Sequence, residues 1–174
     1  MYSDFLKPRF LVLTGFVFLA ALARFIPHPP NFAPIAALAL FGGRYFSDKK
    51  FAFLIPITAM LITDSVLGFH YLMPAVYLSF SLIVLVGIFQ RKWNKTSGIV
   101  AGSVVASTLF FIITNFSEWA VGIIYPKTIS GLVMCFTAAI PFYFSSLIGD
   151  LFYVSVMFIS FELLSKRFLV LAEA

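Results

Sequence analysis

Residues 23–43, ARFIPHPPNFAPIAALALFGG, place an arginine, a histidine and an asparagine among prolines, directly before a run of small and apolar residues. The chain around this stretch is strongly apolar: 61% of its 174 residues are hydrophobic, 11% are charged, and the mean hydropathy is +1.03. So few charged residues do not cover the surface of a soluble domain. The composition therefore predicts an all-α integral membrane protein with one domain, in which the polar stretch connects two membrane helices.

The apolar runs predict six transmembrane helices, since one span needs about 20 residues. We expect these helices near residues 10–26, 32–46, 51–69, 72–90, 98–125 and 141–165. Residues 127–140, KTISGLVMCFTAAI, are too few for a span, and we expect a loop helix or a re-entrant segment there. The first apolar run, after Lys7 and Arg9, also fits a cleavable signal peptide, but we interpret it as a retained helix.

The basic residues lie at alternate connections between the predicted helices. One side of the bundle receives Lys7, Arg9, Arg44, Lys49, Lys50, Arg91, Lys92, Lys95, Lys166 and Arg167. The other side receives only Arg24 and Lys127. The positive-inside rule then predicts a multi-pass protein of the bacterial inner membrane, with both termini in the cytoplasm and the Pro-rich stretch outside. Because topology accounts for the basic clusters, we expect no nucleic-acid partner.

Three acidic residues fall inside the predicted spans, all in the outer half: Asp64, Glu118 and Asp150, about 8 to 14 Å from the outer helix ends at 1.5 Å per residue. A carboxylate in the bilayer costs roughly 2.5 to 3.5 kcal/mol, so such groups face the bundle interior or a wet cavity. Helical spacing predicts two polar stripes, one of Tyr143, Ser146, Asp150 and Tyr153 and one of Ser107, Phe111, Asn115 and Glu118.

These positions predict a solute pocket that opens outward. The candidate substrate-binding residues are Arg24, His28, Asn31, Asp64, His70, Asn115, Glu118, Trp119, Asp150 and Tyr153. A structural network, with Arg24 paired to a carboxylate, is the alternative. Three acids against one arginine favour the pocket, because a structural network would balance its charges.

The same residues contain no known catalytic or metal-binding pattern. The histidines stand alone, no HExxH or CxxC pattern occurs, and Gly42-Gly43 lacks the lysine of a phosphate-binding loop. We therefore expect no catalytic residues, no metal ligands, no cofactor and no enzymatic activity.

The Pro-rich stretch is expected to be a stiff connector, or a lid over the acidic residues, because proline fixes φ. Asn31 is a good N-cap for the helix that follows, with Pro34 in the first turn. The small residues Ala33, Ala37, Ala39 and Gly43 favour close packing against a neighbouring helix.

Four segments carry a family resemblance: PHPPNFAPIAALALFGG (27–43), DSVLGFH (64–70), TNFSEW (114–119) and AAIPFYFSSLIGDLFY (138–153). Together they resemble a family of small bacterial six-helix membrane proteins of unassigned function. That family is similar to the substrate-binding S components of energy-coupling factor vitamin transporters.

This resemblance implies an S-component-like bundle in the lipid bilayer that captures a vitamin-like solute. It also implies a separate transmembrane coupling partner with two ATPases. A structural or assembly subunit of a larger membrane complex is the alternative function.

Overall fold

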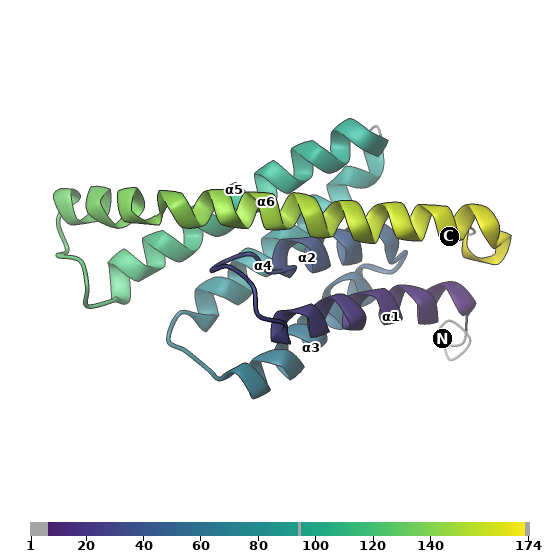
Figure 1. The fold of residues 1–174 in the computed structure, drawn as a ribbon, viewed down its shortest axis with the longest axis horizontal. Helices are drawn as coiled ribbons and strands as arrows, with labels where there is room; N and C mark the ends of the chain where they lie inside the picture. Colours follow the sequence, from purple (N-terminus) through teal and green to yellow (C-terminus); the bar gives the residue numbers. More distant parts are fainter. Residues whose placement is uncertain (1–6, 94, 173–174) are drawn as a thin grey trace.

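The computed structural model describes residues 7–93 and 95–172, and this part of the chain is helical without any strand (Figure 1). The helices are α1 (Pro8–Leu22), α2 (Ile35–Tyr45), α3 (Lys49–Leu67), α4 (Met73–Phe89), α5 (Lys95–Val121) and α6 (Ile129–Arg167). Three short 3-10 helices, η1 (Ala23–Phe25), η2 (Gln90–Lys92) and η3 (Leu169–Leu171), follow α1, α4 and α6. The all-α prediction is confirmed for the described residues.

Five of the helices are long and apolar enough to cross a membrane, when α1 is counted through η1 and α4 through η2. The exception is α2, whose 11 residues extend about 16 Å, roughly half of a hydrocarbon core of about 30 Å. The prediction of six spans is therefore corrected to six helices, of which five have the length of a span. Four prolines between residues 27 and 34 explain the difference, because they keep the preceding segment out of the helix.

The prediction of a separate segment at 127–140 is wrong. Instead, α6 runs without interruption over 39 residues and contains Pro141. Its N-cap is Thr128, whose hydroxyl accepts a hydrogen bond from the N–H of Gly131 at 3.1 Å. Proline is tolerated inside membrane helices because neighbouring helices compensate for the lost hydrogen bond. The sequence predicts a helix that starts at Pro141, whereas α6 continues through this residue.

The short helix α2 lies in the middle of the bundle and packs mainly against α4, α3 and α6 (Figure 1). Its residues 36–43 are all buried. It packs against α4 where two glycines meet: a Cβ added to Gly43 would lie 2.2 Å from the Val84 carbonyl oxygen, and one added to Gly87 would lie 2.5 Å from that of Leu40. The predicted close packing of the small residues is thus confirmed at Gly43, and its partner is α4.

Both ends of α2 meet polar side chains from other helices. At its C-terminus, the Arg91 guanidinium donates to the carbonyl of Gly43 at 2.9 and 2.6 Å, and Arg9 donates to that of Tyr45 at 3.4 Å. At its N-terminus, the backbone N–H of Ala36 lies near the Asp150 carboxylate of α6. Helix ends carry unpaired backbone groups that need such partners when they are buried. Two arginines that the positive-inside rule assigns to topology, Arg9 and Arg91, therefore also cap the C-terminus of a buried helix.

The start of α1 and the end of α6 lie at the same end of the bundle (Figure 1), where Arg9 donates to the carbonyl of Leu171. We call this the terminal end and the opposite one the distal end. The hairpin of α5 and α6 extends past the other helices at the distal end.

Candidate functional site

Two adjoining cavities lie in the distal half of the bundle, beside the N-terminus of α2. Their volumes are about 340 and 300 Å³. Both are lined by Arg24, Asn31, Ile35, Phe110 and Ser146. Because α2 begins only at Ile35, no helix continues along its axis into the distal half of the bundle. The connector 26–34 and the two cavities occupy this space instead.

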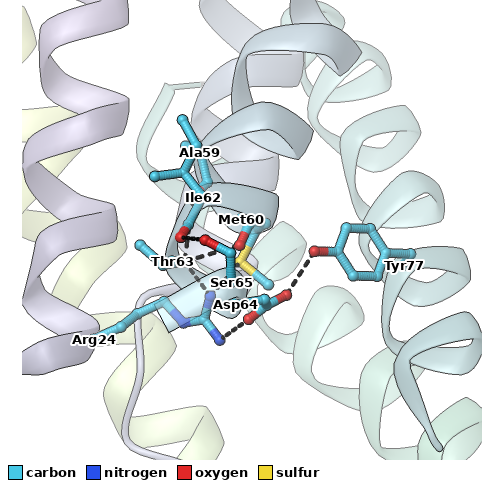
Figure 2. Close-up of polar contacts among 8 residues, drawn as sticks. All are labelled: Arg24, Ala59, Met60, Ile62, Thr63, Asp64, Ser65 and Tyr77. Atoms are coloured by element: carbon cyan, nitrogen blue, oxygen red, sulfur yellow. Dashed lines mark hydrogen bonds and ion pairs between the residues drawn. The ribbon is translucent and has the colours of Figure 1, made fainter. Parts of the chain in front are cut away.

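The most extensive set of polar contacts in the site is the hydrogen-bond network around Asp64 (Figure 2). One carboxylate oxygen of Asp64 pairs with the Arg24 guanidinium at 2.6 Å, and the other accepts a hydrogen bond from the Tyr77 hydroxyl at 2.6 Å. Arg24 also donates to the Thr63 hydroxyl. The side chains of Arg24 and Asp64 are only 12% and 8% exposed. Arg24 thus pairs with a carboxylate, as the alternative of a structural network predicts, and Asp64 has both oxygens engaged.

The two predicted polar stripes face one another across α5 and α6. The Ser107 hydroxyl donates to Asp150 at 2.6 Å, and the Thr108 and Tyr143 hydroxyls lie 3.0 Å apart. The ring of Tyr143 also contacts that of Phe111, with centroids 5.0 Å apart. Asp150 is 4% exposed and also lies near the backbone of Ala36 in α2, so three helices meet at this carboxylate, at the boundary of the smaller cavity.

At the distal rim, Glu118 connects α5 to the loop between α3 and α4. The exposed Tyr71 donates to Glu118 Oε2, and this hydrogen bond to the neutral phenol raises the pKa of Tyr71. The other oxygen, Oε1, is buried and has no hydrogen-bond partner among the described residues. His70, from the same loop, lines the larger cavity with Glu118. The loop begins at Gly68, whose φ of 102° requires glycine.

Eight of the ten predicted site residues line one or both cavities: Arg24, His28, Asn31, Asp64, His70, Asn115, Glu118 and Asp150. The other two, Trp119 and Tyr153, line neither of these cavities. Trp119 donates through its indole N–H to the Pro126 carbonyl at 3.0 Å, and Tyr153 packs on Phe32 with centroids 5.6 Å apart. Both side chains thus hold connections between helices in place.

The prediction that Asn31 caps α2 is wrong, because Pro34 occupies the N-cap position. Asn31 has a φ of 62°, and the Phe32 N–H donates to the Pro29 carbonyl at 3.0 Å. With Pro30 before it, this fits a type II turn, in which asparagine tolerates the left-handed conformation. Asn31 therefore shapes the connector and lines both cavities.

Sequence reasoning missed Tyr71 and Tyr77, which hold the carboxylates of Glu118 and Asp64. Tyr77 lies in a nearly uniform apolar helix, where no periodicity identifies it. Tyr71 adjoins the DSVLGFH segment, and this position could have indicated it. Within residues 7–93 and 95–172, no three His, Cys, Asp or Glu side chains lie close enough to hold one metal ion.

The fold and the cavities define a membrane-type bundle of helices with a polar cavity at its distal end. Residues 5–171 match the sequence model of a family of unknown function, DUF6580, and the chain belongs to this family. This agrees with the resemblance to a family of unassigned function. A search of curated proteins and a search of solved structures each found no match.

Proposed function

We propose that the chain is the substrate-binding membrane subunit of a transporter and captures a small, vitamin-like solute in its distal cavities. The observation that carries the proposal is the convergence of eight predicted polar residues on two cavities that share five lining residues. Volumes of about 300 and 340 Å³ lie at the lower end of the range of small-molecule sites. A cavity that serves packing alone has no need of so many polar side chains.

The charges of the cavity support a solute with a positively charged or hydrogen-bond-donating group. The Arg24 charge is paired with Asp64 at 2.6 Å, whereas Glu118 has only a neutral phenol as a hydrogen-bond partner among the described residues. Phe110, Phe111 and Phe142 line the same cavity and provide apolar and aromatic surface. Aromatic faces and an acid together suit a flat organic solute that carries a cation.

In this proposal the terminal end lies in the cytoplasm of a bacterial cell, and the cavities open outward. The alternate placing of basic residues supports this orientation. The resemblance to S components supports a separate coupling subunit with ATPases as the source of energy for transport.

Single cysteines will test the orientation. In a Cys135→Ser background, Pro29→Cys in the exposed connector should react with an impermeant thiol reagent in intact cells. Ser47→Cys, exposed at the terminal end, should react only after permeabilisation. The Cys135→Ser protein alone sets the background. Labelling of Ser47→Cys but not Pro29→Cys in intact cells would place the cavities in the cytoplasm.

Replacement of Glu118 will test the site. Native mass spectrometry of the gently purified protein should first reveal a retained small molecule, whose affinity is then measured by thermal shift. Glu118→Gln should weaken its binding about ten- to a hundredfold, since a hydrogen bond to a charged group contributes roughly 1.5 to 3 kcal/mol. The control is Glu162→Gln, which makes the same change at the terminal end, where Glu162 accepts from Tyr45 at 3.4 Å. Equal loss in both variants would contradict the proposed site.

A structural or assembly subunit of a larger membrane complex is the second candidate. It is supported by the network of Arg24, Asp64 and Tyr77, in which both carboxylate oxygens of Asp64 have protein partners without any solute. This function predicts a constant protein partner and no retained small molecule. The same mass spectra distinguish it from the transporter subunit.

A further inference from the structure

Asp150 is a buried acid without a countercharge. It is 4% exposed, and it forms no ion pair within the part of the chain that the structure describes. Arg24 lines the same cavity, but its guanidinium is paired with Asp64 at 2.6 Å. The groups beside the Asp150 carboxyl are neutral: the Ser107 hydroxyl, at 2.6 Å, and the backbone N–H of Ala36. A carboxylate with only neutral neighbours is unfavourable inside a bilayer.

The hydrogen bonds of Ser107 indicate where a proton lies. Its Oγ is 2.6 Å from Asp150 Oδ2 and 3.0 Å from the carbonyl oxygen of Ser103, one turn earlier in α5. Both distances are those of hydrogen bonds. A serine hydroxyl has only one hydrogen, whereas the Ser103 carbonyl and an ionised Asp150 both act as acceptors.

A proton on Asp150 Oδ2 resolves this conflict. The acid then donates to Ser107, and Ser107 donates to the Ser103 carbonyl, so each of the two contacts has its own hydrogen. In the ionised form, Ser107 donates to Asp150 instead, and the contact with Ser103 is left without a hydrogen. The geometry of the two contacts therefore favours the neutral acid.

The wall of the smaller cavity contains two further titratable side chains among the described residues, Arg24 of η1 and His28 of the connector. Because the exposed His28 and the buried Asp150 line one cavity, water can reach Asp150 through it. The other titratable groups of the helices packed here lie farther along them or, like Tyr153, contact other residues: Arg44 and Tyr45 of α2, Lys95 and Glu118 of α5, and Tyr143, Tyr153, Glu162, Lys166 and Arg167 of α6.

We infer that Asp150 is a proton-binding site in the wall of the smaller cavity, and that it is a neutral acid at neutral pH in the empty protein. Buried acids of this kind hold and pass protons in membrane transporters. One consequence rests on the transport function proposed above. A cationic solute would bind beside the ionised carboxylate, and the displaced proton would pass to water at the distal end. Binding of the solute would then weaken as the pH falls.

Infrared spectroscopy of the full-length protein in detergent will test the site at neutral pH, because a protonated carboxylic acid has a carbonyl band that a carboxylate lacks. This band should be present for the wild-type protein and lost in Asp150→Asn. It should also shift in D₂O, since the proton exchanges through the cavity. Asp48→Asn makes the same change at an exposed acid and should leave the band in place. An unchanged band in Asp150→Asn, or no shift in D₂O, would overturn the inference.

Ser107→Ala tests the direction of the hydrogen bond without removing the acid. Alanine removes the acceptor of the acid proton and is favourable in a helix, so the band should move to higher frequency and keep its area. Ser103→Ala is the control, because it removes a buried hydroxyl of α5 and keeps the Ser103 carbonyl. An ionised Asp150 gives the same spectrum in this region with or without Ser107, and that result would overturn the inference even if Asp150→Asn did not fold. The affinity loss expected for Glu118→Gln tests the transport function separately, so either proposal can fail alone.

Discussion

Replacing Gly43 with alanine is expected to destabilise the protein by about 3 kcal/mol, at the upper end of the range for overpacking a core. The added methyl group would lie 2.2 Å from the Val84 carbonyl oxygen and 2.9 Å from the Gly87 Cα. Both are backbone atoms, so no side chain can rotate away and α2 must separate from α4. Thermal unfolding in detergent should show the loss as a fall in Tm of roughly 10 °C.

The matched control is the same substitution at Gly15 of α1, where an added Cβ meets no atom within 4 Å. Gly15→Ala should stabilise the protein by about 0.5 to 1 kcal/mol, because alanine loses less backbone freedom than glycine in a helix. Gly87→Ala should behave like Gly43→Ala. Similar melting of the Gly15 and Gly43 variants would show that α2 and α4 are not in backbone contact.

The second large effect is expected at the ion pair of Arg24 and Asp64. Asp64→Asn leaves a largely buried guanidinium without its countercharge, which should cost about 3 kcal/mol. Arg24→Gln should cost a similar amount, because it leaves the buried Asp64 carboxylate without its countercharge. The double variant should lose about 2 kcal/mol less than the sum, since the two residues are in direct contact. Thermal unfolding of the four proteins completes the cycle.

Asp48→Asn is the control for this cycle, because Asp48 is exposed and asparagine is an equally good N-cap; its effect should stay within about 0.5 kcal/mol. Additive losses at Arg24 and Asp64 would contradict the coupling. A normal Tm for Asp64→Asn, together with weakened solute binding, would instead assign the Asp64 charge to the solute.

Much of this arrangement is local in origin and could be predicted from the sequence. The positions of α1, α3, α4 and α5 follow from apolar runs of the length of a span, and they agree with the structure to within a few residues. The contact between Ser107 and Asp150 follows from helical spacing, which put each residue on the polar stripe of its helix. In these cases the length and spacing of the apolar and polar residues match the length and repeat of an α-helix, so the local pattern is enough to predict the structure.

Other features depend on tertiary contacts that no local pattern encodes. The continuation of α6 through Pro141 depends on packing against α5, which outweighs the local preference of proline to begin a helix. Three acids have a similar depth, and Arg24 pairs with Asp64 among them. This choice depends on how α1 and α3 lie together. Trp119 and Tyr153 have the residue types of a binding site, but their directions follow from the connections that they hold.

The capping of α2 has a consequence for how the chain is assembled in the membrane. A segment of 11 residues is too short to be inserted as an independent span by the translocation machinery. The Gly43 carbonyl near its C-terminus gains its donor only when Arg91 has been synthesised, and the Asp150 carboxylate beside its N-terminus follows later still. We therefore expect α2 to take its final position after α6 has entered the bilayer. A nascent chain halted before Asp150 should hold residues 35–45 in a state that proteases and chaperones can still reach.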